Sequence, residues 1–153
     1  MNADTIVRPV TSADYADWRP LWDHYNAFYG RKGAAALSED VTAATWERFL
    51  DPDAPLAALV AERTARIVGI AHYLFHPSTV HSNDVCYLQD LFTADDVRGE
   101  GIGSALISAV CERARAAGSS RVYWHTHESN ARAISLYRKM AELPGFILFL
   151  RAP

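Results

Sequence analysis

The segment Arg98–Ser104 constrains this chain more than any other feature, because glycines alternate along it: Arg98-Gly99-Glu100-Gly101-Ile102-Gly103-Ser104. It lies between an apolar run typical of a strand (85–93) and a run of helical period (104–117). Glycines let the backbone turn tightly and expose several N–H groups where a helix begins. These N–H groups, the helix dipole and the Arg98 guanidinium together predict a site for the pyrophosphate of a cofactor.

The same segment lacks the patterns of two common nucleotide-binding loops. A P-loop requires a lysine after its last glycine, but Ser104 follows Gly103 here. The dinucleotide pattern G-x-G-x-x-G requires a third glycine at the position of Leu106. We therefore expect neither ATP nor NAD as the ligand of this loop.

The hydrophobic periodicity of the whole chain predicts a single domain, 1–153, with a mixed α/β sheet. Its 50% hydrophobic and 22% charged residues suit one compact core. Strands are expected first, followed by the order β-α-β-α-β. The expected strands are 5–10, 57–61, 67–75, 85–93, 121–127 and 146–150, and the expected helices are 14–29, 41–50, 104–117 and 130–140.

The composition of the chain limits which partners it can be expected to bind and in which compartment it is expected. With 18 acidic and 15 basic side chains, the net charge of −3 gives no reason to expect nucleic-acid binding. No apolar run approaches the ~18 residues of a membrane span, and the N-terminus has no signal-peptide pattern, so we expect a cytoplasmic protein that binds no membrane. Cys86 and Cys111 are expected to be free thiols in a reducing compartment. His125 and His127 share a strand face without a third ligand, so no metal is expected.

Two separated motifs carry a resemblance to a known family. Arg98-x-x-Gly101-x-Gly103 resembles the [QR]-x-x-G-x-[GA] signature of the GNAT superfamily of N-acetyltransferases. Downstream, Asn130-x-x-Ala133-x-x-Leu136-Tyr137-x-Lys139, followed by Gly145-Phe146, resembles the second half of that family's cofactor site. Tyr87–Phe92 and Tyr123–Thr126 are similar to the branch that holds histone/polyamine and spermidine/spermine acetyltransferases.

This resemblance implies a fold, an activity and a cofactor site. The fold is a mostly antiparallel sheet with a splayed parallel pair, flanked by helices. The activity is transfer of the acetyl group of acetyl-CoA to an amine. The implied cofactor contacts are the backbone of Leu91, Phe92 and Thr93, the loop residues Arg98, Gly99, Gly101, Ile102, Gly103 and Ser104, and also Asn130, Tyr137 and Lys139.

The resemblance also implies a catalytic acid but leaves the base open. Tyr137 corresponds to the tyrosine that protonates the departing CoA thiolate, a role that suits a phenol. An amine acceptor must lose a proton before it attacks. Spermidine/spermine-type enzymes have Glu-Asp where this chain has Gln89-Asp90, and an amide cannot accept that proton. Asp90 is therefore either the base or a structural anchor on the strand face opposite Gln89. Further titratable candidates are Asp23, His24, Tyr25, His72, His125 and His127.

The acceptor is expected to be a small amine. The residues expected to bind it are Asp23, Tyr25, Tyr29, Gln89 and His125. Acidic residues near the first helix and its following loop, Asp23, Glu39 and Asp40, favour a polyamine or an amino-acid-like amine over protein lysines. The alternatives are a non-catalytic CoA-sensing module, which Gln89 would suit, and an acetyltransferase of protein lysines. By resemblance, residues 146–150 are also a candidate surface for a homodimer.

Overall fold

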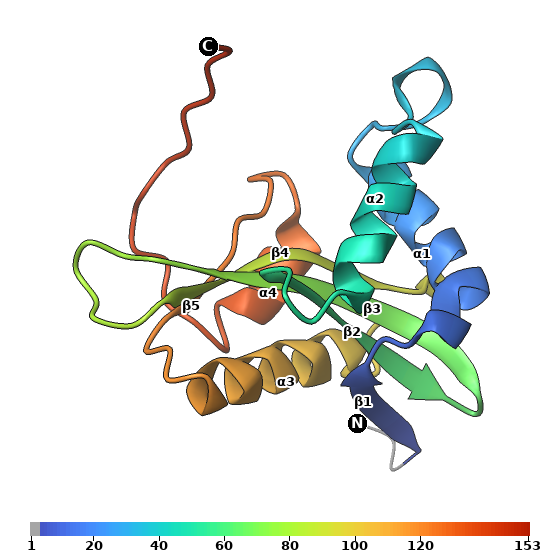
Figure 1. The fold of residues 1–153 in the computed structure, drawn as a ribbon, viewed down its shortest axis with the longest axis horizontal. Helices are drawn as coiled ribbons and strands as arrows, with labels where there is room; N and C mark the ends of the chain where they lie inside the picture. Colours follow the sequence, from blue (N-terminus) through green and yellow to red (C-terminus); the bar gives the residue numbers. More distant parts are fainter. Residues whose placement is uncertain (1–3) are drawn as a thin grey trace.

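A five-stranded mixed sheet forms the centre of the computed structural model, which describes residues 4–153 (Figure 1). The strands stand in chain order; neighbours from β1 to β4 are antiparallel, and β4 and β5 are parallel. This arrangement confirms the predicted mixed sheet with one parallel pair. The strands are β1 (Thr5–Pro9), β2 (Leu56–Arg63), β3 (Arg66–His76), β4 (Val85–Thr93) and β5 (Val122–Tyr123).

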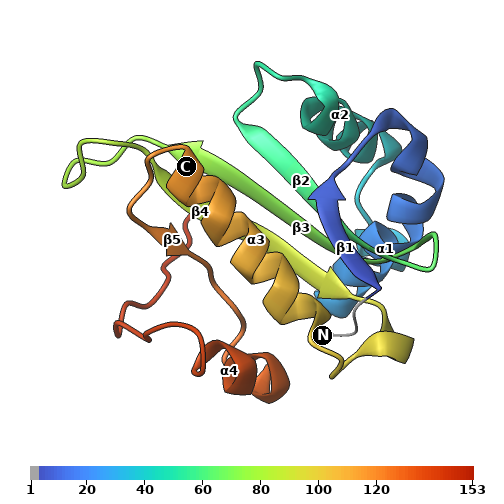
Figure 2. The ribbon, with the colours of Figure 1, turned by 90° about the horizontal axis from the view of Figure 1, so that it is seen from below.

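The helices cover both faces of this sheet. α1 (Tyr15–Phe28) and α2 (Glu39–Leu50) lie on one face, and α3 (Ile102–Ala116) crosses the other, as the two views show (Figures 1 and 2). The short α4 (Ala131–Tyr137) follows β5. Short 3-10 helices occur at Ser12–Asp14, Gly33–Ala35 and Asp95–Val97.

The apolar stripe of α1 packs mainly into the core. Trp18, Leu21, Trp22 and Tyr25 recur at three- and four-residue spacing, and all are buried. The Trp18 ring lies 4.8 Å, centroid to centroid, from that of Trp46 on α2. This aromatic packing fixes α1 and α2 against each other and against the sheet.

A glycine on β3 allows α3 to approach the opposite face closely. A Cβ atom at Gly69 would lie 2.9 Å from Cγ2 of Ile102 and 3.0 Å from Cδ1 of Leu106. The first distance is shorter than real Cβ contacts and the second is tighter than nearly all of them, so a larger residue here would push α3 away from the sheet. Gly69 thereby lets the first turns of α3 pack directly on β3.

Two predicted strands differ in the structure. Residues 146–150, predicted as a strand, form an extended segment outside the sheet and are 63–87% exposed. The strand predicted over 121–127 is only Val122–Tyr123. β5 pairs with β4 at only two positions and then diverges, so β5 offers only a two-residue edge to which a further strand could add.

Three helix boundaries also differ by two or more residues, and the first of these is the start of α3, at Ile102 rather than at Ser104. α2 begins at Glu39 rather than at Val41, because Ser38 caps it and the Ser38 Oγ accepts a hydrogen bond from the Val41 N–H at 3.4 Å. α4 ends at Tyr137 instead of continuing to Met140.

Candidate functional site

The glycine-rich loop leads from β4 into α3 and presents unpaired backbone donors. Gly99 (φ 83°) and Gly101 (φ 84°) adopt left-handed backbone conformations, and Gly101 is the N-cap of α3. Within residues 4–153, the N–H groups of 99–104 have no backbone or side-chain acceptor. The first turn of any helix leaves such donors, which together with the helix dipole favour an anion. The loop therefore has the chemistry expected of a pyrophosphate site.

Two arginines border this loop. Arg98 is folded back on β4: its Nη2 lies 2.8 Å from Asp95 Oδ1, and its guanidinium carbon lies 5.4 Å from the ring centroid of Phe92. Arg132, which was not expected at the site, brings its Nη2 near Gly99, 3.6 Å from where a Cβ would stand. Arg132 is two residues beyond Asn130 in the second motif, and this proximity in sequence is the only signal that could have marked it.

The end of β4 is open on the side of β5. The parallel pairing ends at Tyr87 and Tyr123, so Leu91, Phe92 and Thr93 have no neighbouring strand on that side within the described residues. Unpaired strand groups at such a divergence can hydrogen-bond an extended ligand. The opening leads to the glycine loop, where Gly103 faces Thr93: a Cβ atom at Gly103 would lie 3.8 Å from Thr93 Oγ1.

A cavity, here called the central cavity, lies at this divergence. It brings together residues from α1, β4, the segment after β5 and α4, which are distant in sequence. The residues that line it are Tyr25, Tyr29, Leu88, Gln89, Leu91, Trp124, His125 and Tyr137. Four of the five expected acceptor-binding residues and the expected catalytic tyrosine are thus neighbours. Leu88 and Trp124 were not expected there, although both lie within segments that carry the resemblance.

Tyr137 reaches the central cavity from the end of α4. Its ring packs edge-on against Trp124, with 5.4 Å between the centroids. Burial, and to a smaller extent the neighbouring Tyr29, raise the pKa of Tyr137 to about 12. The phenol therefore keeps its proton at neutral pH and is available as an acid.

Asp90 belongs to a buried hydrogen-bonded chain. Trp18 Nε1 donates to His72 Nε2 at 3.0 Å, and His72 Nδ1 lies 2.9 Å from Asp90 Oδ2. An indole N–H only donates, so His72 Nε2 carries no proton and Nδ1–H donates to the carboxylate. His72, one of the further titratable candidates, is 1% exposed and lies outside the cavity lining, so it does not face the cavity itself.

Tyr25 connects Asp90 with the central cavity. Burial and then the nearby Asp90 carboxylate raise the pKa of Tyr25 well above its usual range. Tyr25 also lines the cavity, whereas Asp90 does not. Strand β4 has a β-bulge at Gln89. Leu88 pairs with Tyr73 and Asp90 pairs with His72, so Gln89 is the extra residue between them. Gln89 thereby faces the cavity without interrupting the Asp90 contact.

The other expected residues lie around these centres. Asn130 caps α4 through its Oδ1, which accepts from the Ala133 N–H at 3.4 Å, and Lys139 is exposed just beyond α4. The His125 Nδ1 lies 3.3 Å from the Tyr87 hydroxyl. Asp23 is not in the central cavity; it lines a separate hollow between α1 and α2, where it pairs with Arg19 at 2.9 Å.

The described residues contain neither a cluster of metal ligands nor a helix that could span a membrane. Within residues 4–153, no group of three or more His, Cys, Asp or Glu side chains is arranged to hold a metal ion. No helix in that range has the length and apolarity that crossing a membrane requires.

Comparison with known sequences identifies the family. The family model described as "Acetyltransferase (GNAT) family" matches residues 18–141. The chain is 33% identical to the D-amino-acid N-acetyltransferase HPA3 of Saccharomyces cerevisiae, in an alignment covering 99% of this chain and 92% of that protein. It is 27% identical to the uncharacterized N-acetyltransferase YhfO of Bacillus subtilis, with 92% and 93% covered.

Comparison with solved structures agrees on the fold. The aminoglycoside N-acetyltransferase AAC(6')-Iy, in complex with a bisubstrate analogue, superposes with a TM-score of 0.82 at 20% identity, covering 97% of this chain and 98% of that one. The ribosomal-protein-alanine N-acetyltransferase of Brucella melitensis gives a TM-score of 0.77 at the same identity and coverage. Taken with the family match over most of its length, the chain belongs to the acetyltransferase (GNAT) family and is an acetyl-CoA-dependent N-acetyltransferase.

Proposed function

We propose that the chain transfers the acetyl group of acetyl-CoA directly to the primary amine of a small molecule, either an amino-acid-like amine or a polyamine. One observation carries this proposal: a single cavity at the divergence of β4 and β5 gathers a protonated phenol, Tyr137, with Tyr25, Tyr29, Gln89 and His125. The name of the yeast relative, a D-amino-acid N-acetyltransferase, supports a small amine acceptor. The two thiols, Cys86 and Cys111, are unpaired and suit a cytoplasmic location.

The chain's own donors fit the cofactor. The unpaired N–H groups of 99–104 and the guanidiniums of Arg98 and Arg132 would hold the pyrophosphate. The open edge of β4 at Leu91, Phe92 and Thr93 would hydrogen-bond the pantetheine arm through its backbone. Asn130 and Lys139, at the two ends of α4, would contact the same ligand. Acetyl-CoA bound in this way supplies an activated thioester.

Two proton transfers accompany the reaction. The N–C bond forms as the C–S bond breaks, so one proton must leave the amine and one must reach the sulfur. Tyr137 donates the second proton, because its raised pKa keeps it protonated at neutral pH.

Asp90 is the base in this proposal, acting through Tyr25. The Asp90 carboxylate already accepts one hydrogen bond, from His72, and lies close to the Tyr25 hydroxyl. A proton from the amine would pass through the Tyr25 hydroxyl, or a water beside it, to Asp90. Gln89 contributes only hydrogen bonding, since an amide does not take up a proton.

Calorimetric titration with acetyl-CoA, followed by a screen of amines for release of free CoA thiol, tests the function. We expect binding and turnover of at least one amino acid or polyamine. Binding without turnover of any amine would support a cofactor-sensing module instead. Turnover of lysine peptides alone would contradict the small-molecule acceptor.

A further inference from the structure

Arg31 is held rigidly in the loop that follows α1. Its Nε donates to Asn26 Oδ1 at 2.6 Å, and its backbone N–H donates to Asn26 O at 2.9 Å. Asn26 is itself buried, 4% exposed, and its Nδ2 donates to the Trp22 carbonyl at 2.8 Å. The arginine is therefore tied to the core through one buried amide, and little side-chain entropy remains to be lost on binding a ligand.

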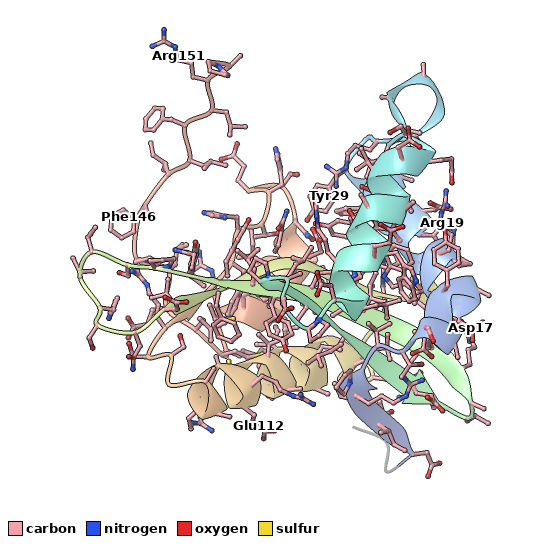
Figure 3. All side chains as sticks on the ribbon, viewed as in Figure 1. Asp17, Arg19, Tyr29, Glu112, Phe146 and Arg151 are labelled. Atoms are coloured by element: carbon pink, nitrogen blue, oxygen red, sulfur yellow. The ribbon has the colours of Figure 1, made fainter. Side chains whose placement is uncertain are left out.

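The guanidinium of Arg31 lies against two tyrosines of the central cavity. Its central carbon is 5.8 Å from the ring centroid of Tyr25 and 5.6 Å from that of Tyr29. Both tyrosines line the cavity, and Figure 3 shows Tyr29 where α1 ends. Arg31 itself lines the neighbouring hollow between α1 and α2. The charge thus stands at the border of the two spaces, on the α1 wall of the proposed acceptor site.

Arg31 has no acidic partner among residues 4–153. No carboxylate lies within 4.0 Å of its guanidinium, and no hydrogen bond from either terminal nitrogen to another described residue is present. Arg19, in the same hollow, differs completely: it pairs with Asp23 at 2.9 Å and with Glu39 at 2.6 Å. Two of the acidic residues expected to attract a polycation are thus already engaged by Arg19.

We propose that Arg31 binds the carboxylate of the acceptor, which makes the acceptor an amino acid rather than a polyamine. This inference rests on the proposed function and names its substrate class. A planar guanidinium with both terminal nitrogens available matches a carboxylate in a bidentate manner. The ammonium group of a zwitterion needs a negative charge, and Asp90, which lies outside the cavity lining, is next to Tyr25, which belongs to it. A polyamine would instead meet a fixed positive charge.

The test compares each acceptor with its own carboxamide. Wild type, Arg31→Gln and Arg31→Lys are assayed with both enantiomers of alanine and phenylalanine, with the corresponding carboxamides, and with spermidine. The ratio of kcat/KM for acid over amide, taken relative to wild type, cancels the different basicity of the two amines. In Arg31→Gln this ratio should fall about 10- to 100-fold, mainly through KM. Arg31→Lys keeps the positive charge but cannot bind a carboxylate through two parallel hydrogen bonds. Its ratio should lie between those of Arg31→Gln and wild type.

Lys32→Gln is the matched control. It removes the neighbouring exposed positive charge and should leave the ratio within about twofold, since exposed charges act weakly at a distance. The KM for acetyl-CoA should be unchanged in all variants. A fall in acetyl-CoA affinity with an unchanged acceptor ratio would assign Arg31 to the cofactor and overturn the proposal.

The outcome also distinguishes the role of Arg31 from the activity itself. Wild-type turnover of spermidine but not of any amino acid would overturn the role of Arg31 and leave the small-amine acetyltransferase standing. Equal losses on acid and amide in Arg31→Gln would show a merely structural role. Failure to acetylate any amine would contradict the proposed function itself.

Discussion

In the proposed reaction Tyr137 donates a proton and Asp90 accepts one, and the two residues belong to different elements of the fold. Tyr137 comes from α4 and is kept protonated by burial, while Asp90 comes from β4 and accepts from the neutral His72. Paired groups whose surroundings favour opposite protonation states are typical of acid–base catalysis. Both roles can be tested one residue at a time.

Replacing Tyr137 with Phe should lower kcat about 100- to 1,000-fold, because the leaving sulfur loses its proton donor. The affinity for acetyl-CoA, measured by calorimetry, should change less than about twofold. Because the pKa of Tyr137 is raised to about 12, its ionisation should cause no loss of wild-type activity up to about pH 10. An alkaline decline near pH 8–9 that disappears in the Phe variant would contradict this assignment.

Replacing Asp90 with Asn should lower kcat/KM about 100-fold while preserving the fold, since an amide oxygen still accepts from His72 Nδ1. The circular-dichroism melting curve checks the fold, and the pH–rate profile checks the role. In the variant the rate should follow the fraction of free amine in solution. A variant with wild-type kinetics, or one that loses activity only in proportion to its stability, would leave Asp90 as a structural anchor.

At the scale of elements, the approach of α3 to the end of β4 positions the glycine-rich loop that we propose binds the cofactor. Gly69 lets α3 lie close to the sheet, and Gly101 ends the loop in a left-handed conformation that starts the helix. The loop donors are therefore oriented by the packing of a whole helix rather than by the loop alone. A residue with a side chain would be strained at position 101, and this strain should affect ligand binding as well as the stability of the fold.

Gly101→Ala should cost about 1–2 kcal/mol of the free energy of unfolding and lower Tm by about 2–6 °C. It should also weaken acetyl-CoA binding about tenfold, because the loop N–H groups turn away from the anion. Gly118→Ala is the control: Gly118 has the same kind of conformation, φ 81°, at the other end of α3. That variant should lose similar stability but bind acetyl-CoA normally; equal weakening in both would indicate a general effect of instability.

At the scale of the molecule, the segment 146–150 stands away from the sheet (Figures 1 and 3). Its residues, Phe146-Ile147-Leu148-Phe149-Leu150, are all apolar and at least 63% exposed. Exposed apolar side chains in an extended segment favour association with another chain. We predict that two copies associate through it.

Light scattering after size exclusion should give about 34 kDa, twice the 17.0 kDa of the chain. A chain ending at Gly145 should elute as a monomer. The control ends at Leu150, which removes only Arg151, Ala152 and Pro153 and should stay dimeric. A monomeric full-length chain would refute the predicted dimer.

Local patterns in the sequence were sufficient to predict the glycine-rich loop at the start of α3, the first four strands of the sheet and the apolar face of α1. Alternating glycines, a cap residue and three- or four-residue spacing act over a few positions, so their physical consequences can be read directly from the chain. The motifs around Gly101 and Tyr137 also indicated the family before any contact was known.

Contacts between distant residues were decided only by the tertiary structure. Trp18 donates to His72, 54 positions away, and a bulge at Gln89 determines how Asp90 meets that histidine. The predicted strand 146–150 was wrong because periodicity cannot show whether a partner edge exists. Arg31 likewise resembles any loop arginine in the sequence. The role proposed for Arg31 depends on which carboxylates and aromatic rings lie around it. Burial and ion pairing are properties of the folded chain alone.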